Sequence, residues 1–148
     1  MAEPFSFRPY DERDREACFR IFDANCPAFF APSERADLAE FLAVPPAGYE
    51  VAVDDTGVVG AFGVRRESGG LHLRWIMIAP AAQGRGLGRA MVARALSAVR
   101  AEGGNALHIA TSHQSEAFFA RFGAIEVRRT PDGWGPGMHR VDLVLPVA

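Results

Sequence analysis

Hydrophobic residues recur along this 148-residue chain with two spacings, one typical of strands and one typical of helices. Alternating or short continuous apolar runs predict seven β-strands, at residues 5–8, 49–53, 58–64, 71–78, 106–112, 125–129 and 141–145. Apolar side chains on one face predict helices whose first residues or caps are Asp11, Ser33 and Leu87. This order predicts one α/β domain over residues 1–148, with a mixed sheet and helices on both faces.

The segment from residue 71 to 101 combines a strand, a glycine-rich turn and a helix. Pro80 ends the strand, because proline has no N–H for the ladder and fixes φ. The helix is stopped by Gly103-Gly104. Its apolar face is formed by Leu87, Met91, Val92, Leu96 and Val99.

The turn between this strand and helix reads Gln83-Gly84-Arg85-Gly86-Leu87-Gly88. Glycines at alternate positions leave backbone N–H groups uncovered by Cβ atoms, and the helix N-terminus adds partial positive charge. Arg85 and Arg89 are placed to add charge at the rim. The turn therefore predicts a cradle for a phosphate or pyrophosphate, although such a turn can also serve only to reverse the chain.

Two other phosphate motifs do not fit this turn. A P-loop needs Gly-Lys-Ser/Thr, and all 16 basic residues of the chain are arginine. A dinucleotide-binding turn needs G-x-G-x-x-G near the first strand and an acidic residue on the next one. Here the glycines are spaced G-x-G-x-G, they lie past mid-chain, and the next strand carries His108.

Composition narrows the classes of function. The net charge is −2, with no basic excess for nucleic acid or an anionic membrane surface. The two cysteines, Cys18 and Cys26, make no disulfide framework, and we expect both to be reduced and at least half buried. No residues have metal-ligand spacing, so no metal is expected. Neither a leader nor an 18-residue apolar run occurs, which predicts a cytoplasmic protein.

Two motifs in order resemble the GNAT superfamily of N-acetyltransferases. The first is Q-x-x-G-x-G after a strand ending in Ile-x-Pro, which resembles the acetyl-CoA pyrophosphate motif. The second is Phe118-Phe119-Ala120-Arg121-Phe122-Gly123-Ala124, which follows the strand at 106–112 and resembles F-Y-x-x-x-G-F on a short helix. The resemblance implies a GNAT-like fold of about seven mostly antiparallel strands. It also implies direct transfer of acetyl from acetyl-CoA to a primary amine of a small molecule or peptide.

The resemblance also implies roles for individual residues. The strand at 71–78 would splay from the next strand, so that its backbone holds the pantetheine arm. The amide of Ile76 would donate to the thioester carbonyl, and His72 falls where some members carry a catalytic glutamate. His72 as a solvent-facing strand residue is an equal alternative, and Glu50 and His113 are lesser candidates for the base. The implied cofactor-binding residues are Ile76, Met77, Ile78, Gln83, Gly84, Arg85, Gly86, Leu87, Gly88, Arg89, Ser112 and Phe119.

The chain departs from the family pattern at three positions. Phe119 stands where many members have a tyrosine near the leaving sulfur, Ser112 replaces an asparagine, and Ala124 replaces an aromatic residue. Ser112 is a candidate hydrogen-bond donor in catalysis, or a turn former. Because Phe119 has no hydroxyl, a non-catalytic acyl-CoA-binding sensor is the alternative function, and a scaffold that keeps only the fold is a weaker one.

The acceptor site is expected between the loops at 25–32 and 130–138, which correspond to the variable acceptor regions of the family. The aromatic residues of these loops are Phe29, Phe30 and Trp134. The alternative is that Phe29 and Phe30 are core residues beneath the loop. Candidate polar groups for orienting an amine are Asp23, Glu50, Asp132 and His139. Residues 131–137 are rich in glycine and proline and predict an irregular loop. An exposed final strand would let a second copy pair, which leaves a homodimer open.

Overall fold

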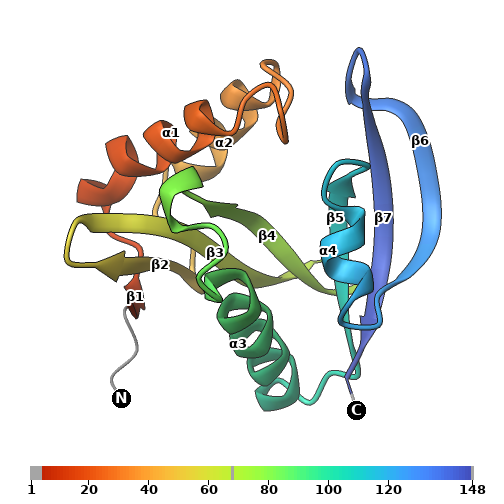
Figure 1. Cartoon of the computed structure of the whole chain (residues 1–148). Coiled ribbons are helices and arrows are strands. Elements are labelled where there is room, and N and C mark those ends of the chain that lie inside the picture. Colours follow the sequence, from red (N-terminus) through yellow and green to blue (C-terminus); the bar gives the residue numbers. More distant parts are fainter. Residues whose placement is uncertain (1–4, 68, 148) are drawn as a thin grey trace.

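A computed structural model describes residues 5–67 and 69–147 and contains one seven-stranded sheet (Figure 1). Its strand order is β1-β2-β3-β4-β5-β7-β6, and only the β4–β5 pair is parallel. The strands are β1 (Ser6–Pro9), β2 (Tyr49–Asp54), β3 (Gly57–Glu67), β4 (Gly70–Ile78), β5 (Ala106–Ser112), β6 (Ile125–Gly135) and β7 (Met138–Pro146). The predicted mixed, mostly antiparallel sheet is confirmed.

Helices cover both faces of this sheet, as predicted. In Figure 1, α1 and α2 lie above the β1–β4 part of the sheet, and α3 lies below it. Each side has its own apolar core, one built on Phe22, Leu38 and Val51, the other on Met91 and Leu107. The helices are η1 (Glu12–Asp14), α1 (Arg15–Ala24), α2 (Glu34–Leu42), η2 (Pro80–Ala82), α3 (Leu87–Ala101) and α4 (Glu116–Ala120).

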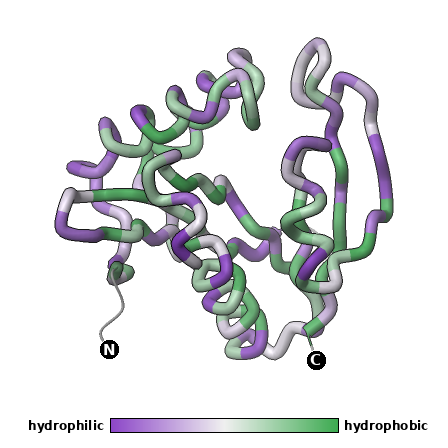
Figure 2. Tube along the Cα trace, viewed as in Figure 1, coloured by the Kyte–Doolittle hydropathy of each residue, from purple (hydrophilic) through white to green (hydrophobic). Residues whose placement is uncertain are grey.

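The α3 helix forms as its apolar spacing predicts. Leu87, Met91, Val92 and Val99 are all almost fully buried on one face of it. Figure 2 shows hydrophobic and hydrophilic residues alternating along α1 and α3, as expected for helices with one buried face. Gly103 ends α3 with a left-handed φ of 72°, which glycine adopts without the steric cost of a Cβ.

The structure refines both predicted helix starts in the N-terminal half. Asp11 caps the short η1 turn through a reciprocal capping box with Asp14, and α1 follows directly. Ser33 precedes α2 but makes no capping bond, because its hydroxyl donates to the carbonyl of Trp134 at 3.1 Å. Ser33 thus occupies the predicted N-cap position without a side-chain capping bond, and the Glu34 carboxylate accepts from the Ala31 N–H at 2.7 Å.

The segment at 131–137 is not the irregular loop that its glycines and prolines predict. The β6 strand runs on to Gly135, and β7 starts at Met138, with a register shift between Thr130 and Gly135. Proline is tolerated because β6 is the edge strand, where one side of the backbone needs no partner. The final strand lies between β5 and β6, so the expectation of an exposed final strand is also wrong; β6 and β1 are the two edge strands of the sheet.

The sheet splits between its two parallel strands. β4 and β5 pair only at Leu71–Leu107 and His72–His108, and beyond these pairs they diverge (Figure 1). The splay implied by the resemblance is therefore present. The opening exposes the backbone of β4 toward β5 from residue 73 onward, and the functional site is built around this opening.

Candidate active site

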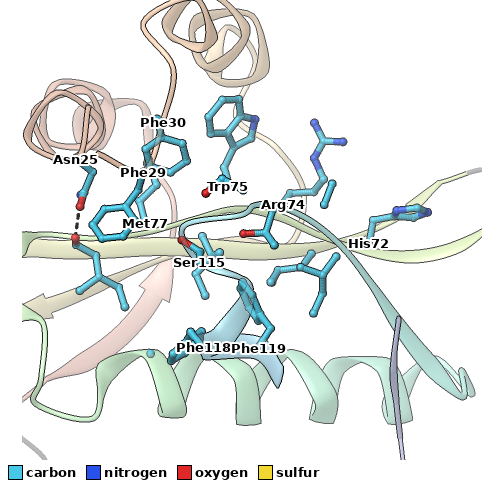
Figure 3. Close-up of a pocket in the computed structure, with 18 of the residues that line it drawn as sticks. Asn25, Phe29, Phe30, His72, Arg74, Trp75, Met77, Ser115, Phe118 and Phe119 are labelled. Atoms are coloured by element: carbon cyan, nitrogen blue, oxygen red, sulfur yellow. Dashed lines mark hydrogen bonds between the residues drawn. The ribbon is translucent and has the colours of Figure 1, made fainter. Parts of the chain in front are cut away.

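A cleft of about 1410 Å³ occupies the opening between β4 and β5. Residues from the α1–α2 segment, β4, the turn before α3, β5 and α4 line it. Figure 3 shows aromatic side chains reaching the cleft on both sides of β4, with Phe30 and Trp75 on one side and Phe118 and Phe119 on the other. The cleft thus joins the predicted cofactor turn to the predicted acceptor loop.

The turn before α3 has the geometry of an anion cradle. Gly84 and Gly86 have φ of 79° and 83°, and a Cβ built on either would meet no atom within 4 Å. Among the residues that the structure describes, the backbone N–H groups from Gly84 to Arg89 find no acceptor, and the first bond of the helix is from Ala90 to Gly86. These unpaired donors at a helix N-terminus are suited to bind phosphate oxygens.

The remaining members of the motif have other tasks. Gly88 permits close packing, because a Cβ there would lie 2.8 Å from the Phe118 ring. The Leu87 side chain is buried in the core, so only its backbone is available to a ligand. Arg89 lines the cleft and lies over the Phe122 ring at 5.8 Å.

Arg85 does not stand at the rim of the cradle as predicted. Its guanidinium donates to the Asp54 carboxylate at 2.9 Å, and Arg85 is not among the residues that line the cleft. Hydrogen bonds from Thr56 and from Arg85 lower the pKa of Asp54 to about 2. Arg85 therefore ties the turn to the β2–β3 hairpin, a contact between distant segments that sequence spacing does not reveal.

A buried asparagine, which sequence reasoning missed, joins the cradle to β4. The Asn25 amide donates to the Ile78 carbonyl at 2.9 Å (Figure 3) and to the Ile21 carbonyl at the end of α1. Gln83 donates to Asn25 Oδ1 and to the same Ile78 carbonyl, each at 3.2 Å. The Ile78 carbonyl is thus held by two side-chain amides. An asparagine directly after the C-terminus of an amphipathic helix is the sequence signal for this role.

The middle of β4 is interrupted by a bulge. Gly63 pairs with Arg74 and Ala61 with Met77, so Trp75 and Ile76 have no register partner on β3. Trp75 has a φ of 43°, an uncommon value for a residue with a large side chain. Ile76 and Ile78 line the cleft, and Met77 is 2 % exposed with its side chain packed in the core.

Ser112 and Phe119, from the end of β5 and from α4, line the cleft opposite β4. Ser112, at the end of β5, is 5 % exposed, and its buried hydroxyl has no hydrogen-bond partner among the described residues. Phe119 is 2 % exposed and packs edge-on against Phe118 at 5.0 Å. An unpaired buried hydroxyl is costly, so the Ser112 oxygen is suited to a ligand that bonds to it.

His72 lines the cleft near the point where β4 and β5 meet, apart from Trp75 in Figure 3. The His72 ring stacks on the His108 ring with 4.9 Å between the ring centroids. The Nε2 atom of His72 is buried and has no hydrogen-bond partner among the described residues. His72 as a whole is half-buried, with its Nε2 buried and available to a ligand. His108 is its packed neighbour and is not among the residues that line the cleft.

The aromatic residues expected at the acceptor site all line the cleft, but the expected polar groups do not. Phe30 stacks on Phe22 at 5.0 Å, and the Trp134 indole N–H donates to the Thr111 carbonyl at 2.9 Å. The four polar candidates have other partners: Asp23 bonds to Arg35, Glu50 bonds to Arg94, and the Asp132 N–H donates to the His139 ring. His113, a lesser candidate for the base, accepts from the His139 N–H and is also not among the residues that line the cleft. Those predictions for the acceptor site are wrong.

Acidic residues of α2 take the place of the expected polar groups. Glu34, Asp37 and Glu40 all line the cleft, and their spacing of three residues puts them on one helical face. Glu34 is 6 % exposed. Desolvation by burial raises the pKa of the Glu34 carboxyl to about 7, although the hydrogen bond from Ala31 acts in the opposite direction.

The remaining sequence expectations concern cysteines, membranes and metals. Cys18 is buried, Cys26 is half buried, and both are free thiols. Burial raises the pKa of Cys18 to about 12. Within residues 5–67 and 69–147 no helix has the length and apolar character needed to cross a bilayer. The same residues contain no cluster of three or more His, Cys, Asp or Glu side chains with the grouping of metal ligands.

Comparison with known proteins places this site in a family. The model of the Acetyltransferase (GNAT) family matches residues 15–124. A structure assigned to the GNAT family, from Desulfovibrio desulfuricans, shares 26% identity over 97% of this chain and 99% of its own, with a TM-score of 0.78.

Two further structures are similar in fold at lower identity. The ribosomal-protein-S18-alanine N-acetyltransferase of Escherichia coli shares 14% identity, with a TM-score of 0.78 over 97% of this chain and 94% of its own. The protein yncA of Salmonella typhimurium, solved with its cofactor acetyl-CoA, shares 20% identity, with a TM-score of 0.69 over 98% and 95%. No curated protein matches the chain in sequence. The family model and the structural neighbours agree with the two motifs, and the chain belongs to the GNAT family of acetyltransferases.

Proposed function

We propose that this protein transfers an acetyl group from acetyl-CoA directly to a primary amine of a small molecule or peptide. The observation that carries the proposal is one continuous cleft that contains both the unpaired N–H groups from Gly84 to Arg89 and the bulge of β4. In the transfer, the amine nitrogen bonds to the acetyl carbon, the carbon–sulfur bond breaks, and the sulfur keeps the bonding electrons as it leaves as a thiolate. Acetyl-CoA supplies the activated thioester.

The residues of the cleft divide this work. The turn from Gln83 to Arg89 holds the diphosphate, and the backbone of β4 from Ile76 to Ile78 holds the arm that reaches the reacting carbonyl. The Ile76 N–H donates to the carbonyl oxygen as negative charge develops there. His72 takes the proton that the amine loses, directly or through water, and the Ser112 hydroxyl donates to the departing sulfur.

The acceptor half of the cleft supports an amine substrate. Glu34, Asp37 and Glu40 line it, and no ion pair joins any of the three to a basic side chain among the described residues. Amines are largely protonated in solution near neutral pH, so the carboxylates of Asp37 and Glu40, joined by Glu34 above pH 7, attract them to the aromatic wall formed by Phe30 and Trp134.

The function is tested by mixing the protein with acetyl-CoA and a panel of amines, and measuring thiol release. We expect acetyl-CoA to raise the melting temperature, because it binds the folded state alone, and at least one amine to release coenzyme A. The panel should contain diamines, amino acids and peptides with a free N-terminus. No stabilisation at saturating acetyl-CoA would end the proposal.

A non-catalytic acyl-CoA sensor is the second candidate function. The specific observation in its favour is Phe119, which occupies the cleft wall without a hydroxyl. It predicts stabilisation by acetyl-CoA together with no thiol release above the uncatalysed rate for any amine.

His72→Gln is expected to lower kcat by about 100-fold, since proton transfer by a positioned side chain contributes on that order. The KM for acetyl-CoA should change little, because His72 lies at the closed end of the opening and not at the cradle. Steady-state kinetics measure both constants. The matched control is His108→Gln, which changes the stacked partner outside the cleft and should keep kcat. Equal losses in the two variants would show that the histidine stack, and not proton transfer, matters.

A further inference from the structure

A tyrosine two strands away holds the backbone of the β4 bulge. Tyr49 begins β2, and its hydroxyl donates to the Trp75 carbonyl at 2.6 Å. The ring reaches Trp75 by crossing Gly63 on β3, where an added Cβ would lie 2.8 Å from the Tyr49 ring. Glycine at this β3 position therefore makes room for a hydrogen bond between strands that are not neighbours in the sheet.

This hydrogen bond sets the direction of the Ile76 N–H. The peptide between Trp75 and Ile76 is planar and trans, so its N–H points opposite to its carbonyl. Tyr49 reaches that carbonyl from β2 across Gly63 of β3, so the N–H on the opposite edge of the same peptide points away from Tyr49. The side of β4 away from β3 is the opening toward β5.

The ladder does not hold this peptide in place. Neither Trp75 nor Ile76 has a register partner on β3, and the pairing of β4 with β5 ends at His72. A left-handed φ at a residue such as Trp75 is strained, so the conformation needs support from its surroundings. Tyr49 supplies such support from outside the strand.

Tyr49 is itself rigid and remains a donor. It is 2 % exposed, with Phe41 and Tyr10 packed edge-on against its ring at 5.1 Å and 5.8 Å. Desolvation raises the pKa of the Tyr49 hydroxyl well above its ordinary value, so the group keeps its proton at any working pH. A carbonyl can accept only from the protonated form.

We propose that Tyr49 is a positioning residue, which holds the Trp75–Ile76 peptide so that the Ile76 N–H faces the acyl carbonyl oxygen in the cleft. The inference rests on the proposed function. It predicts that Tyr49 acts on the thioester through Ile76 without touching it, and that its hydroxyl matters more when the ligand carries a thioester carbonyl than when it does not.

The matched control is another tyrosine of the same core. The Tyr10 hydroxyl is buried, lies in the same apolar cluster and has no hydrogen-bond partner among the described residues. Tyr10→Phe and Tyr49→Phe therefore remove the same atom from neighbouring rings, but only the second frees the bulge carbonyl. Both changes keep the ring, so both variants should fold.

The experiment compares wild type, Tyr10→Phe and Tyr49→Phe by three readouts: the ¹⁵N–¹H signal of Ile76, the Kd values of acetyl-CoA and of coenzyme A, and kcat. Tyr49→Phe should move the Ile76 signal in the ligand-free protein. It should weaken acetyl-CoA binding about tenfold relative to coenzyme A, which lacks the carbonyl, and lower kcat by at least tenfold. Tyr10→Phe should match the wild type in all three.

Several results would overturn the inference. An unchanged Ile76 signal would show that Tyr49 does not orient the peptide, and equal losses of affinity for acetyl-CoA and coenzyme A would show a general structural effect. If the wild type binds acetyl-CoA and both variants match it in all three readouts, the inference is removed and the proposed function stands. Wild-type protein that does not bind acetyl-CoA would remove both.

Discussion

Gly86→Ala is expected to abolish the stabilisation of this protein by acetyl-CoA. Gly86 lines the cleft with a φ of 83°, and a Cβ there would point into open space beside the unpaired N–H groups. That space is where the diphosphate must lie to reach those donors. A ligand at 100 times its Kd stabilises the wild type by about 2.7 kcal/mol, or roughly 8 °C, and this shift should be lost in the variant.

The control for this prediction is Gly103→Ala. Gly103 has a φ of 72°, and a Cβ there would likewise meet no atom within 4 Å, but it lies at the other end of α3 and outside the cleft. Both variants should therefore lose a similar 1–2 kcal/mol in the absence of ligand, because both force alanine into the left-handed region. Differential scanning fluorimetry with and without acetyl-CoA separates strain from binding. If acetyl-CoA raised the melting temperature of both variants equally, the turn at Gly84–Gly88 would serve only to reverse the chain and not to bind the ligand.

Glu34→Gln is expected to stabilise the protein at pH 8 and to leave it almost unchanged at pH 4. Burial raises the pKa of the Glu34 carboxyl in the folded protein from 4.5 to about 7. Between pH 4.5 and pH 7 this carboxyl is ionised in the unfolded chain but still protonated in the folded protein. The free energy of unfolding therefore falls as pH rises through this range, and the loss is complete above pH 7. A shift of this size corresponds to a cost on the order of 3 kcal/mol.

Chemical denaturation of the wild type and Glu34→Gln from pH 4 to pH 8 measures this difference. Glutamine keeps an oxygen for the Ala31 N–H, so the substitution removes the charge and not the hydrogen bond. Glu40→Gln, an exposed change on the same helix, is the control and should stay within about 0.5 kcal/mol of the wild type at every pH. A difference between wild type and Glu34→Gln that does not vary with pH would contradict the prediction.

A residue that destabilises the fold at neutral pH needs a compensating role. Glu34 stands in the wall of the acceptor half, where an uncharged side chain of the same size would pack at lower cost. Strained or costly groups concentrate at functional sites for this reason. The stability gained by Glu34→Gln is thus expected to accompany weaker binding of the acceptor amine.

Local patterns determined the parts of the fold that depend on short stretches of sequence. The apolar spacing from Leu87 to Val99 sufficed for α3, since burial of one face decides a helix with such a period. The glycines at 84 and 86 sufficed for the cradle, because a left-handed turn before a helix leaves N–H groups unpaired whatever surrounds it. Periodicity likewise located all seven strands.

The residues that sequence reasoning missed act across long separations. Asn25 reaches Ile78, Arg85 reaches Asp54, and Tyr49 reaches Trp75 over the glycine at position 63. Each of these side chains is ordinary in its local context, and the partner is known only once the strands are ordered. The acidic face of α2 was missed for the same reason, since only the packed structure turns that face toward the cleft.

The sequence by itself thus determined the strand–turn–helix unit and the strands of the sheet, because these follow from periodicity and from the special backbone of glycine and proline. The family came from the resemblance of two motifs, which the family model bears out. Only the tertiary structure decided which polar groups line the cleft and how the last hairpin closes on it. Side-chain partners and burial depend on how distant segments approach one another, and Ser33 shows this, since its hydroxyl leaves the helix it was expected to cap and bonds to Trp134 instead.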